Sequence, residues 1–173
     1  MKIFLNGYMG SGKSLLGKQL AAHLNYDFLD LDDQIETIEG KTIHGIFQEK
    51  GELYFRKLET QVLKDVLEEP SNLVVSLGGG TPCYGKNLEL IKETPNSKTI
   101  YLKASVEELT RRLFPEKIHR PVISHLETRE ALEEFIRKHM FERGYYYHQS
   151  DIVVNVDNAT PTEILNEIEE KLK

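Results

Sequence analysis

The sequence contains one cysteine, Cys83, and no tryptophan among its 173 residues. A single cysteine cannot form a disulfide within the chain, and no group of cysteine and histidine residues has the spacing of zinc ligands. These absences exclude a disulfide-stabilised scaffold and a structural zinc site. The low cysteine content is typical of proteins that work in a reducing compartment.

Long apolar runs and an excess of positive charge are also absent. No stretch approaches the roughly 18 consecutive apolar residues of a membrane-spanning helix, and the apolar start is interrupted at Asn6, before the length of a secretory signal. The 28 Asp and Glu residues outnumber the 22 Lys and Arg residues, so the net charge is −6. Such an acidic chain is unsuited to coating nucleic acid. We therefore expect a cytoplasmic protein without membrane or nucleic-acid partners, in which anions are bound only locally.

The sequence does contain short apolar runs that alternate with longer segments of helical periodicity. This alternation is typical of an α/β fold, in which a parallel sheet of five strands lies between two layers of helices. A chain of this length is expected to form a single domain, residues 1–173, and to act as a monomer. The predicted strands are 2–5, 26–29, 73–77, 99–102 and 152–156, and the predicted helices are 14–24, 59–68, 106–113 and 161–172.

Two of the predicted helices begin with the sequence pattern of a capping box. Ser105 is followed three residues later by Glu108, and Thr160 is followed in the same way by Glu163. In this motif the hydroxyl of the first residue accepts a hydrogen bond from the N–H of the residue three positions later, and the carboxylate of that glutamate accepts one from the N–H of the first residue. We expect both helices to start in this way.

Residues 114–128 do not follow the helical pattern. Pro115 and Pro121 interrupt any helix, and the residues between them are mostly charged or polar. We expect a mobile flap here.

Residues 7–14 read Gly-Tyr-Met-Gly-Ser-Gly-Lys-Ser, directly between a predicted strand and a predicted helix. This pattern, G-x-x-x-x-G-K-[ST] in that context, predicts a P-loop whose backbone N–H groups surround phosphate oxygens. Lys13 would reach the β- and γ-phosphates, and the Ser14 hydroxyl would bind Mg²⁺. We expect a purine nucleoside triphosphate with Mg²⁺, although kinases, hydrolases and switches all use this loop. The expected nucleotide-binding residues are Gly10, Ser11, Gly12, Lys13, Ser14 and Leu15.

Acidic residues follow the second predicted strand. Asp30 and Asp32 lie where ligands bind in open α/β sheets, beyond the carboxyl ends of the strands. One carboxylate could orient and deprotonate an acceptor hydroxyl group, and the other could hold the waters of a metal ion. The alternative is an acidic helix start in which both side chains only stabilise the helix dipole.

Three consecutive glycines, Gly78, Gly79 and Gly80, follow the third predicted strand. Without side chains they leave the backbone open to a close ligand, which predicts a second ligand-binding loop. The alternative is a tight turn without a ligand, in which glycine only supplies positive φ.

The full set of motifs resembles one family, shikimate kinase, in the nucleoside-monophosphate-kinase-like group of P-loop proteins. The resemblance spans nearly the whole chain, and the order and spacing of its pieces make it specific. The pieces are GYMGSGKS at 7–14, FLDLDDQIE at 28–36, GELYFRKLE at 51–59, SLGGGTP at 76–82, HRP at 119–121 and Glu142-Arg143 before a tyrosine-rich turn.

The resemblance implies roles for the residues of the acceptor site. Asp32 matches the aspartate that holds the shikimate hydroxyls and acts as the catalytic base. Arg56 and Arg143 match the pair of arginines that grip the substrate carboxylate, which suits the fork geometry of guanidinium groups. The glycine loop, Gly78 to Gly80, matches the substrate loop.

The resemblance also implies roles on the nucleotide side. Asp30 matches an aspartate that is held near Mg²⁺ through water. Arg120 matches the lid arginine that acts on the transferring phosphoryl group, together with Lys13 as a catalytic residue. Arg112 matches the arginine that stacks on adenine.

Together these implications describe an ATP:shikimate 3-phosphotransferase on the route to chorismate and the aromatic amino acids. It would have a helical substrate-binding region near residues 31–60 and a lid near residues 112–124. A kinase for another small polyol acid, such as gluconate, is the nearest alternative, but it would not need Arg56 and Arg143 around a glycine loop. A nucleotide-dependent switch is a second alternative, but it would give no role to Asp32 and Arg143.

Overall fold

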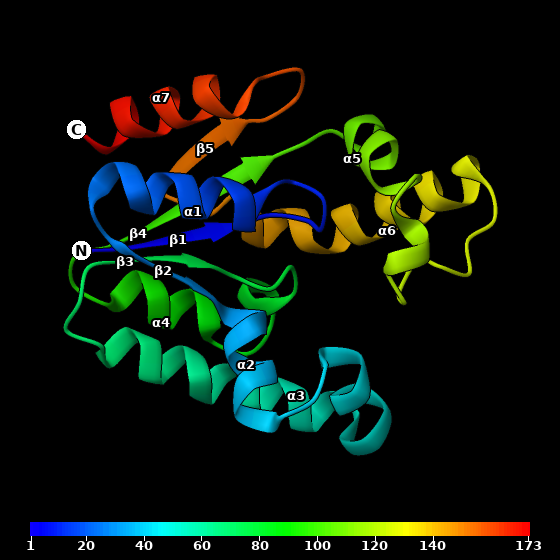
Figure 1. Ribbon diagram of the computed structural model, residues 1–173, viewed down its shortest axis with the longest axis horizontal. Helices are drawn as coiled ribbons and strands as arrows, with labels where there is room; N and C mark the ends of the chain where they lie inside the picture. Colours follow the sequence, from blue (N-terminus) through cyan, green and yellow to red (C-terminus); the bar gives the residue numbers. More distant parts are fainter.

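The computed structural model describes residues 1–173 and contains one five-stranded sheet (Figure 1). The strands run parallel in the order β2-β3-β1-β4-β5, which confirms the predicted sheet. Each observed strand overlaps one of the five predicted runs. The strands are β1 (Lys2–Asn6), β2 (Asp27–Asp30), β3 (Leu73–Ser76), β4 (Ser97–Lys103) and β5 (Ile152–Asn155).

Helices cover both faces of the sheet and form the expected three layers. Figure 1 shows α1 and α7 on one face and α3 and α4 on the other, with α2, α5 and α6 toward the ends to which the strand arrows point. None of these helices has the length and apolar character required to cross a membrane. The helices are α1 (Lys13–Leu24), α2 (Leu31–Glu39), α3 (Ile43–Glu68), α4 (Asn87–Glu93), α5 (Val106–Leu113), α6 (Arg129–Tyr147) and α7 (Pro161–Leu172).

The two faces of the central strand β1 supply two separate hydrophobic clusters. Ile3 and Leu5 are fully buried in the cluster under α1, α5, α6 and α7. Phe4, between them, is fully buried in the cluster under α2, α3 and α4. Successive strand residues point to opposite faces, so an uninterrupted apolar run is what a strand buried on both sides requires.

Three helices, α2, α4 and α6, go beyond those predicted from periodicity. Helix α6 has 19 residues, but only Leu132, Ile136 and Tyr147 are buried, while Phe141 is 90% exposed. An apolar pattern spread around the helix gives a weak periodic signal. Helix α3 also begins well before the predicted residue 59, although Gly51 interrupts it with a φ of 78°.

One of the two expected capping boxes is complete and the other is not. At α7, the Thr160 hydroxyl accepts from Glu163 N–H and the Glu163 carboxylate accepts from Thr160 N–H, as predicted. At α5, the Ser105 hydroxyl accepts from Glu108 N–H at 3.1 Å, but the Ser105 N–H donates to Asp157 instead. The capping box predicted at α5 is therefore wrong in one of its two hydrogen bonds, the one from Ser105 N–H to the Glu108 carboxylate. That carboxylate instead accepts from Arg111 and Arg112.

Residues 114–128 contain turns and the 3₁₀ turn η2 (Lys117–His119), but no α-helix, as the two prolines predict. The segment is nevertheless anchored, because Ile123 is fully buried in the cluster that contains residues of α6. Lys117 also donates to the carbonyl oxygen of Leu126 at 2.7 Å. The segment therefore folds as a compact loop attached to α6.

Candidate active site

The segments that follow β1, β2, β3 and β4 all lie at one edge of the sheet, because parallel strands end on the same side. A cavity of about 580 Å³ opens there. Its lining includes residues from the P-loop, from the acidic turn after β2, from the glycine loop and from the segment after α5. Among them are Gly10, Gly12, Lys13, Ser14, Leu15, Asp30, Asp32, Gly79, Arg112 and Arg120.

The P-loop has the backbone geometry that its glycines allow. Gly7, Gly10 and Gly12 have φ values of 141°, 82° and 96°, which other residues rarely adopt. Gly12 is the N-cap of α1, and no side chain caps this helix. The first N–H groups of α1 thus have no side-chain acceptor. The N-terminal end of a helix attracts anions, so these N–H groups are available to a phosphate group. Ser11 is buried, and its hydroxyl has no hydrogen-bond partner.

Lys13 folds back onto the P-loop. Its ammonium group donates to the carbonyl oxygens of Gly7 at 2.9 Å and of Tyr8 at 3.1 Å. Burial lowers the pKa of Lys13 to about 8, against the opposing influence of Asp32 and Asp30. A partly buried ammonium group whose hydrogen bonds go only to carbonyl oxygens is well suited to receive a multiply charged anion.

Asp30 serves as a helix cap and also contacts the P-loop. As the N-cap of α2 it accepts from Asp32 N–H at 3.1 Å, so a helix does begin at this acidic turn. Its other carboxylate oxygen accepts from the Ser14 hydroxyl at 2.6 Å. The Ser76 hydroxyl lies 3.4 Å from that of Ser14, because Ser76 pairs with Asp30 in the sheet. A cluster of oxygen atoms of this kind is what Mg²⁺ prefers.

Asp32 lies in the first turn of α2 and faces the glycine loop. Burial raises its pKa to about 6, and the nearby charges of Asp30 and Glu59 act in the same direction. A carboxyl group of this kind is ionised at neutral pH but accepts a proton more readily than a solvated one.

The glycine loop is glycine-rich because of close contacts rather than backbone conformation. None of Gly78, Gly79 and Gly80 has a positive φ, so the alternative of a turn that needs positive φ is wrong. A Cβ on Gly78 would lie 2.8 Å from Oδ1 of Asp32, and one on Gly80 would lie 2.7 Å from Nη2 of Arg56. The loop therefore lies directly against Asp32 and Arg56, two of the three side chains to which the resemblance gives a role in binding the acceptor.

Arg56 is held from several sides. It donates to Glu59 at 2.9 Å, and its Nε lies 3.6 Å from a carboxylate oxygen of Glu52. The guanidinium carbon lies 3.9 Å from the ring centre of Tyr84, an arrangement typical of a cation–π contact. The other oxygen of Glu59, which is 1% exposed, accepts from the Thr81 hydroxyl and so links Arg56 to the turn after the glycine loop.

Arg143 approaches the same loop from α6. A Cβ on Gly79 would lie 3.5 Å from Nη1 of Arg143. The Tyr147 hydroxyl donates to the carbonyl oxygen of Gly79 from one turn further along α6. The structure thus brings Arg56 and Arg143, 87 positions apart in the chain, to neighbouring residues of one loop.

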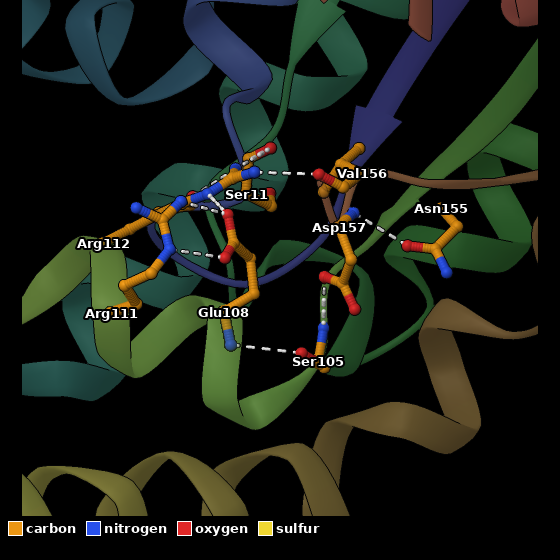
Figure 2. A network of polar contacts seen from close by, with 9 residues as sticks. Ser11, Ser105, Glu108, Arg111, Arg112, Asn155, Val156 and Asp157 are labelled. Atoms are coloured by element: carbon orange, nitrogen blue, oxygen red, sulfur yellow. Dashed lines mark hydrogen bonds and ion pairs between the residues drawn. The ribbon is translucent and has the colours of Figure 1, made fainter. Parts of the chain in front are cut away.

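Arg112 contacts the P-loop and belongs to a network of polar contacts (Figure 2). It donates to Glu108 at 2.6 Å, to the Gly10 carbonyl at 3.2 Å and to the Val156 carbonyl at 2.9 Å. Arg111 binds both oxygens of the same Glu108 carboxylate. Hydrogen bonds from the two arginines hold the pKa of Glu108 at about 2. Arg112 therefore links the P-loop to the segment after β5.

Arg120 lies in the loop between α5 and α6 and lines the cavity. Its only ion pair joins it to Glu116, at 3.0 Å, and its side chain is 37% exposed. Leu15 also lines the cavity and is 56% exposed.

Three residues of this site, Glu59, Tyr84 and Tyr8, are not predicted from the sequence. Glu59 has a partial signal, because it follows Arg56 at a helical spacing of three. Tyr84 and Tyr8 have no sequence signal. Tyr84 belongs to no motif, and Tyr8 occupies a position of the P-loop pattern that accepts any residue. Their contacts arise only when the chain is folded.

Known proteins resemble this chain along almost its whole length. The family model for shikimate kinase matches residues 9–173. The shikimate kinase of Flavobacterium psychrophilum is 43% identical over 167 residues, which is 96% of each chain. The crystal structure of shikimate kinase from Bacteroides thetaiotaomicron covers 99% of this chain and 98% of its own, with a TM-score of 0.91 at 37% identity. Shikimate kinase from Acinetobacter baumannii, solved in complex with shikimate, covers 99% of this chain and 92% of its own, with a TM-score of 0.87 at 31% identity. The chain therefore belongs to the shikimate kinase family.

Proposed function

We propose that this enzyme transfers the γ-phosphoryl group of ATP to the 3-hydroxyl group of shikimate, giving ADP and shikimate 3-phosphate. The observation that carries the proposal is that Lys13, Asp32 and Gly79 line one cavity. A phosphate-binding loop, a carboxylate of raised pKa and an arginine-flanked glycine loop therefore meet in one place. Phosphoryl transfer depends on this kind of positioning more than on covalent chemistry by the protein.

The nucleotide side supports ATP with Mg²⁺. The P-loop N–H groups and Lys13 would hold the β- and γ-phosphates, while Arg112 would lie against adenine. The Ser14 hydroxyl and the Asp30 carboxylate, 2.6 Å apart, are the residues that would hold Mg²⁺, with Asp30 acting through water. When bound, Mg²⁺ would neutralise charge on the β- and γ-phosphates.

The acceptor side supports a small anion with hydroxyl groups, as shikimate is. Arg56 and Arg143 would grip the carboxylate beside the glycine loop, since guanidinium groups bind carboxylates with two parallel hydrogen bonds. Asp32 would hold the 3-hydroxyl group and accept its proton as the oxygen attacks the γ-phosphorus. The bond between the γ-phosphorus and the bridging oxygen breaks, and ADP leaves.

Charge on the transferring group would be met by Lys13 and Arg120, both of which line the cavity. Residues 112–124 would act as a lid that brings Arg120 inward and excludes water, and residues 31–60 would form the substrate-binding region. We place the enzyme in the cytoplasm as a monomer.

Identification of the product tests this proposal. The purified protein is incubated with Mg·ATP and shikimate, and the product is examined by ³¹P and ¹H NMR. Phosphate on the 3-hydroxyl group is expected, and it should be lost in Asp32→Asn and Arg143→Ala. Phosphate on another hydroxyl group, or ATP hydrolysis without a phosphorylated acceptor, would contradict the assigned geometry. The second outcome would favour the switch alternative.

A further inference from the structure

Tyr8 occupies a variable position of the P-loop pattern, yet it is one of the most buried residues, with 1% of its surface exposed. Its carbonyl oxygen accepts a hydrogen bond from Lys13. Its ring lies under the guanidinium group of Arg143, with 5.7 Å between the ring centre and the guanidinium carbon. Its hydroxyl lies 3.0 Å from Nδ1 of His139. One residue thus contacts both the phosphate side and the acceptor side of the site.

The residues that meet Tyr8 share a face of α6. His139 and Arg143 are four positions apart, so they lie one above the other on the helix. Tyr147 continues this face and reaches the carbonyl oxygen of Gly79. Phe135 precedes it, with its ring centre 4.3 Å from that of His139. Helix α6 contacts α5, which precedes the lid segment, and the turn after the glycine loop. The helix therefore extends from the lid segment to the glycine loop.

The protonation states of Tyr8 and His139 favour a stable hydrogen bond between their side chains. Burial raises the pKa of Tyr8 to about 12, so its hydroxyl keeps its proton. Burial and the charge of Arg143 lower the pKa of His139, so the imidazole is neutral at pH 7. A neutral imidazole beside Arg143 avoids a second positive charge and can share one proton with the Tyr8 hydroxyl.

Simple packing explains the buried ring of Tyr8 but not its hydroxyl. A leucine or phenylalanine would fill the same apolar surroundings, whereas a buried hydroxyl costs free energy unless it is bonded. The hydroxyl is bonded to the same helix that carries Arg143. No hydrogen bond or ion pair joins the Arg143 guanidinium group to the P-loop, and its other neighbours, Gly79 and Tyr147, lie outside that loop.

We propose that Tyr8, through its ring and its bond to His139, is a positioning residue that holds Arg143 beside Gly79. The inference rests on the proposed function, in which Arg143 binds the substrate carboxylate. Because the same residue belongs to the P-loop, the carboxylate end of the substrate is fixed relative to the phosphates. Fixing both ends restricts the acceptor hydroxyl to geometries near the reactive one.

A double-mutant cycle on shikimate binding tests this inference. Isothermal titration with shikimate is performed on the wild type, Tyr8→Leu, Arg143→Lys and the combined variant. Tyr8→Leu should weaken binding about tenfold, while the KM for ATP changes less than about twofold. In the Arg143→Lys background, the same Tyr8→Leu change should weaken binding less than about twofold, because the guanidinium group it positions is gone. Full additivity of the two losses would overturn the inference.

Conservative variants separate the hydroxyl from the ring. Tyr8→Phe should weaken shikimate binding by about threefold, and His139→Leu should match it, while His139→Gln, which keeps an acceptor, should restore most of the loss. Tyr101→Phe is the matched control, because Tyr101 is equally buried and its hydroxyl has no partner. An equal loss in Tyr8→Phe and Tyr101→Phe would also overturn the inference. If the wild type neither binds nor phosphorylates shikimate, the proposed function itself has failed.

Discussion

Gly80 lies so close to Arg56 that a Cβ atom on it would stand 2.7 Å from Nη2 and 2.9 Å from Nη1 of the guanidinium group. Arg56 has little freedom to retreat, because Glu59 binds it from one side and Tyr84 stacks on it from another. The backbone of Gly80, with a φ of −95°, would itself accept alanine. The glycine is therefore required by the arginine and not by the turn.

Substitution of this glycine should weaken shikimate binding specifically. Gly80→Ala forces the guanidinium group to move, so we expect the KM for shikimate to rise about tenfold or more, with a smaller change in the KM for ATP. Steady-state kinetics with each substrate varied measures both. Gly144→Ala is the control, because an added Cβ there meets only His148, at 4.0 Å, in a helix that favours alanine. Equal KM values for Gly80→Ala and the wild type would show that Arg56 does not contact the acceptor.

Arg111 and Arg112 offer a matched pair on the nucleotide side. Both bind Glu108, but only Arg112 also reaches the carbonyl oxygens of Gly10 and Val156. Arg112→Lys loses this fork of donors, so the KM for ATP should rise about five- to tenfold while the KM for shikimate stays unchanged. Arg111→Lys should leave both within about twofold. Equal effects of the two substitutions on the KM for ATP would argue against a nucleotide role for Arg112.

The activity should depend on pH through two groups of the free enzyme. Asp32 must be ionised to accept the hydroxyl proton, and its pKa is about 6, so kcat/KM should rise as the pH increases through about 6. Lys13 must be protonated to bind phosphate, and its pKa is about 8, so kcat/KM should fall above about 8. Asp32→Asn should remove the acidic limb from the residual activity. A profile that stays flat between pH 5 and about 7 would contradict the role of Asp32 as base.

The raised pKa of Asp32 means that this residue costs stability. The folded state binds its proton more tightly than the unfolded chain does, so stability decreases as the pH rises from about 4 to about 6. Asp32→Asn should therefore raise the free energy of unfolding at pH 7 by about 1 to 3 kcal/mol, while activity is lost. Urea unfolding at pH 7 and pH 5 measures the gain, which should be smaller at pH 5. A loss of stability at pH 7 would show that the charge of Asp32 helps the fold.

Much of the fold follows from local sequence signals. The strands β1, β3 and β5 are continuous apolar runs that suit only a sheet covered on both faces, and the P-loop pattern identifies the junction of β1 and α1. Once parallel strands are recognised, Asp30 and the glycine loop must meet the P-loop at one edge of the sheet. The position of the site thus follows from topology.

The partners of individual side chains do not follow from local signals. The Glu108 carboxylate fits a capping box by spacing, but in the fold two arginines occupy it and Asp157 accepts from the Ser105 N–H in its place. Similarly, Tyr8 fills a position that the P-loop motif leaves open, and only the packing of α6 gives it partners. Such contacts join residues more than a hundred positions apart or replace one local bond by another. They are therefore decided by tertiary structure.

The most direct test is the rate of ADP release from Mg·ATP by the purified protein with shikimate, with gluconate and with neither. We expect shikimate alone to increase the rate strongly, because Arg56 and Arg143 flank the glycine loop and are the residues that we propose to bind the shikimate carboxylate. The increase should disappear in Asp32→Asn. Stimulation by gluconate but not by shikimate, or ATP binding with no stimulation by either acid, would contradict the assignment of the acceptor site.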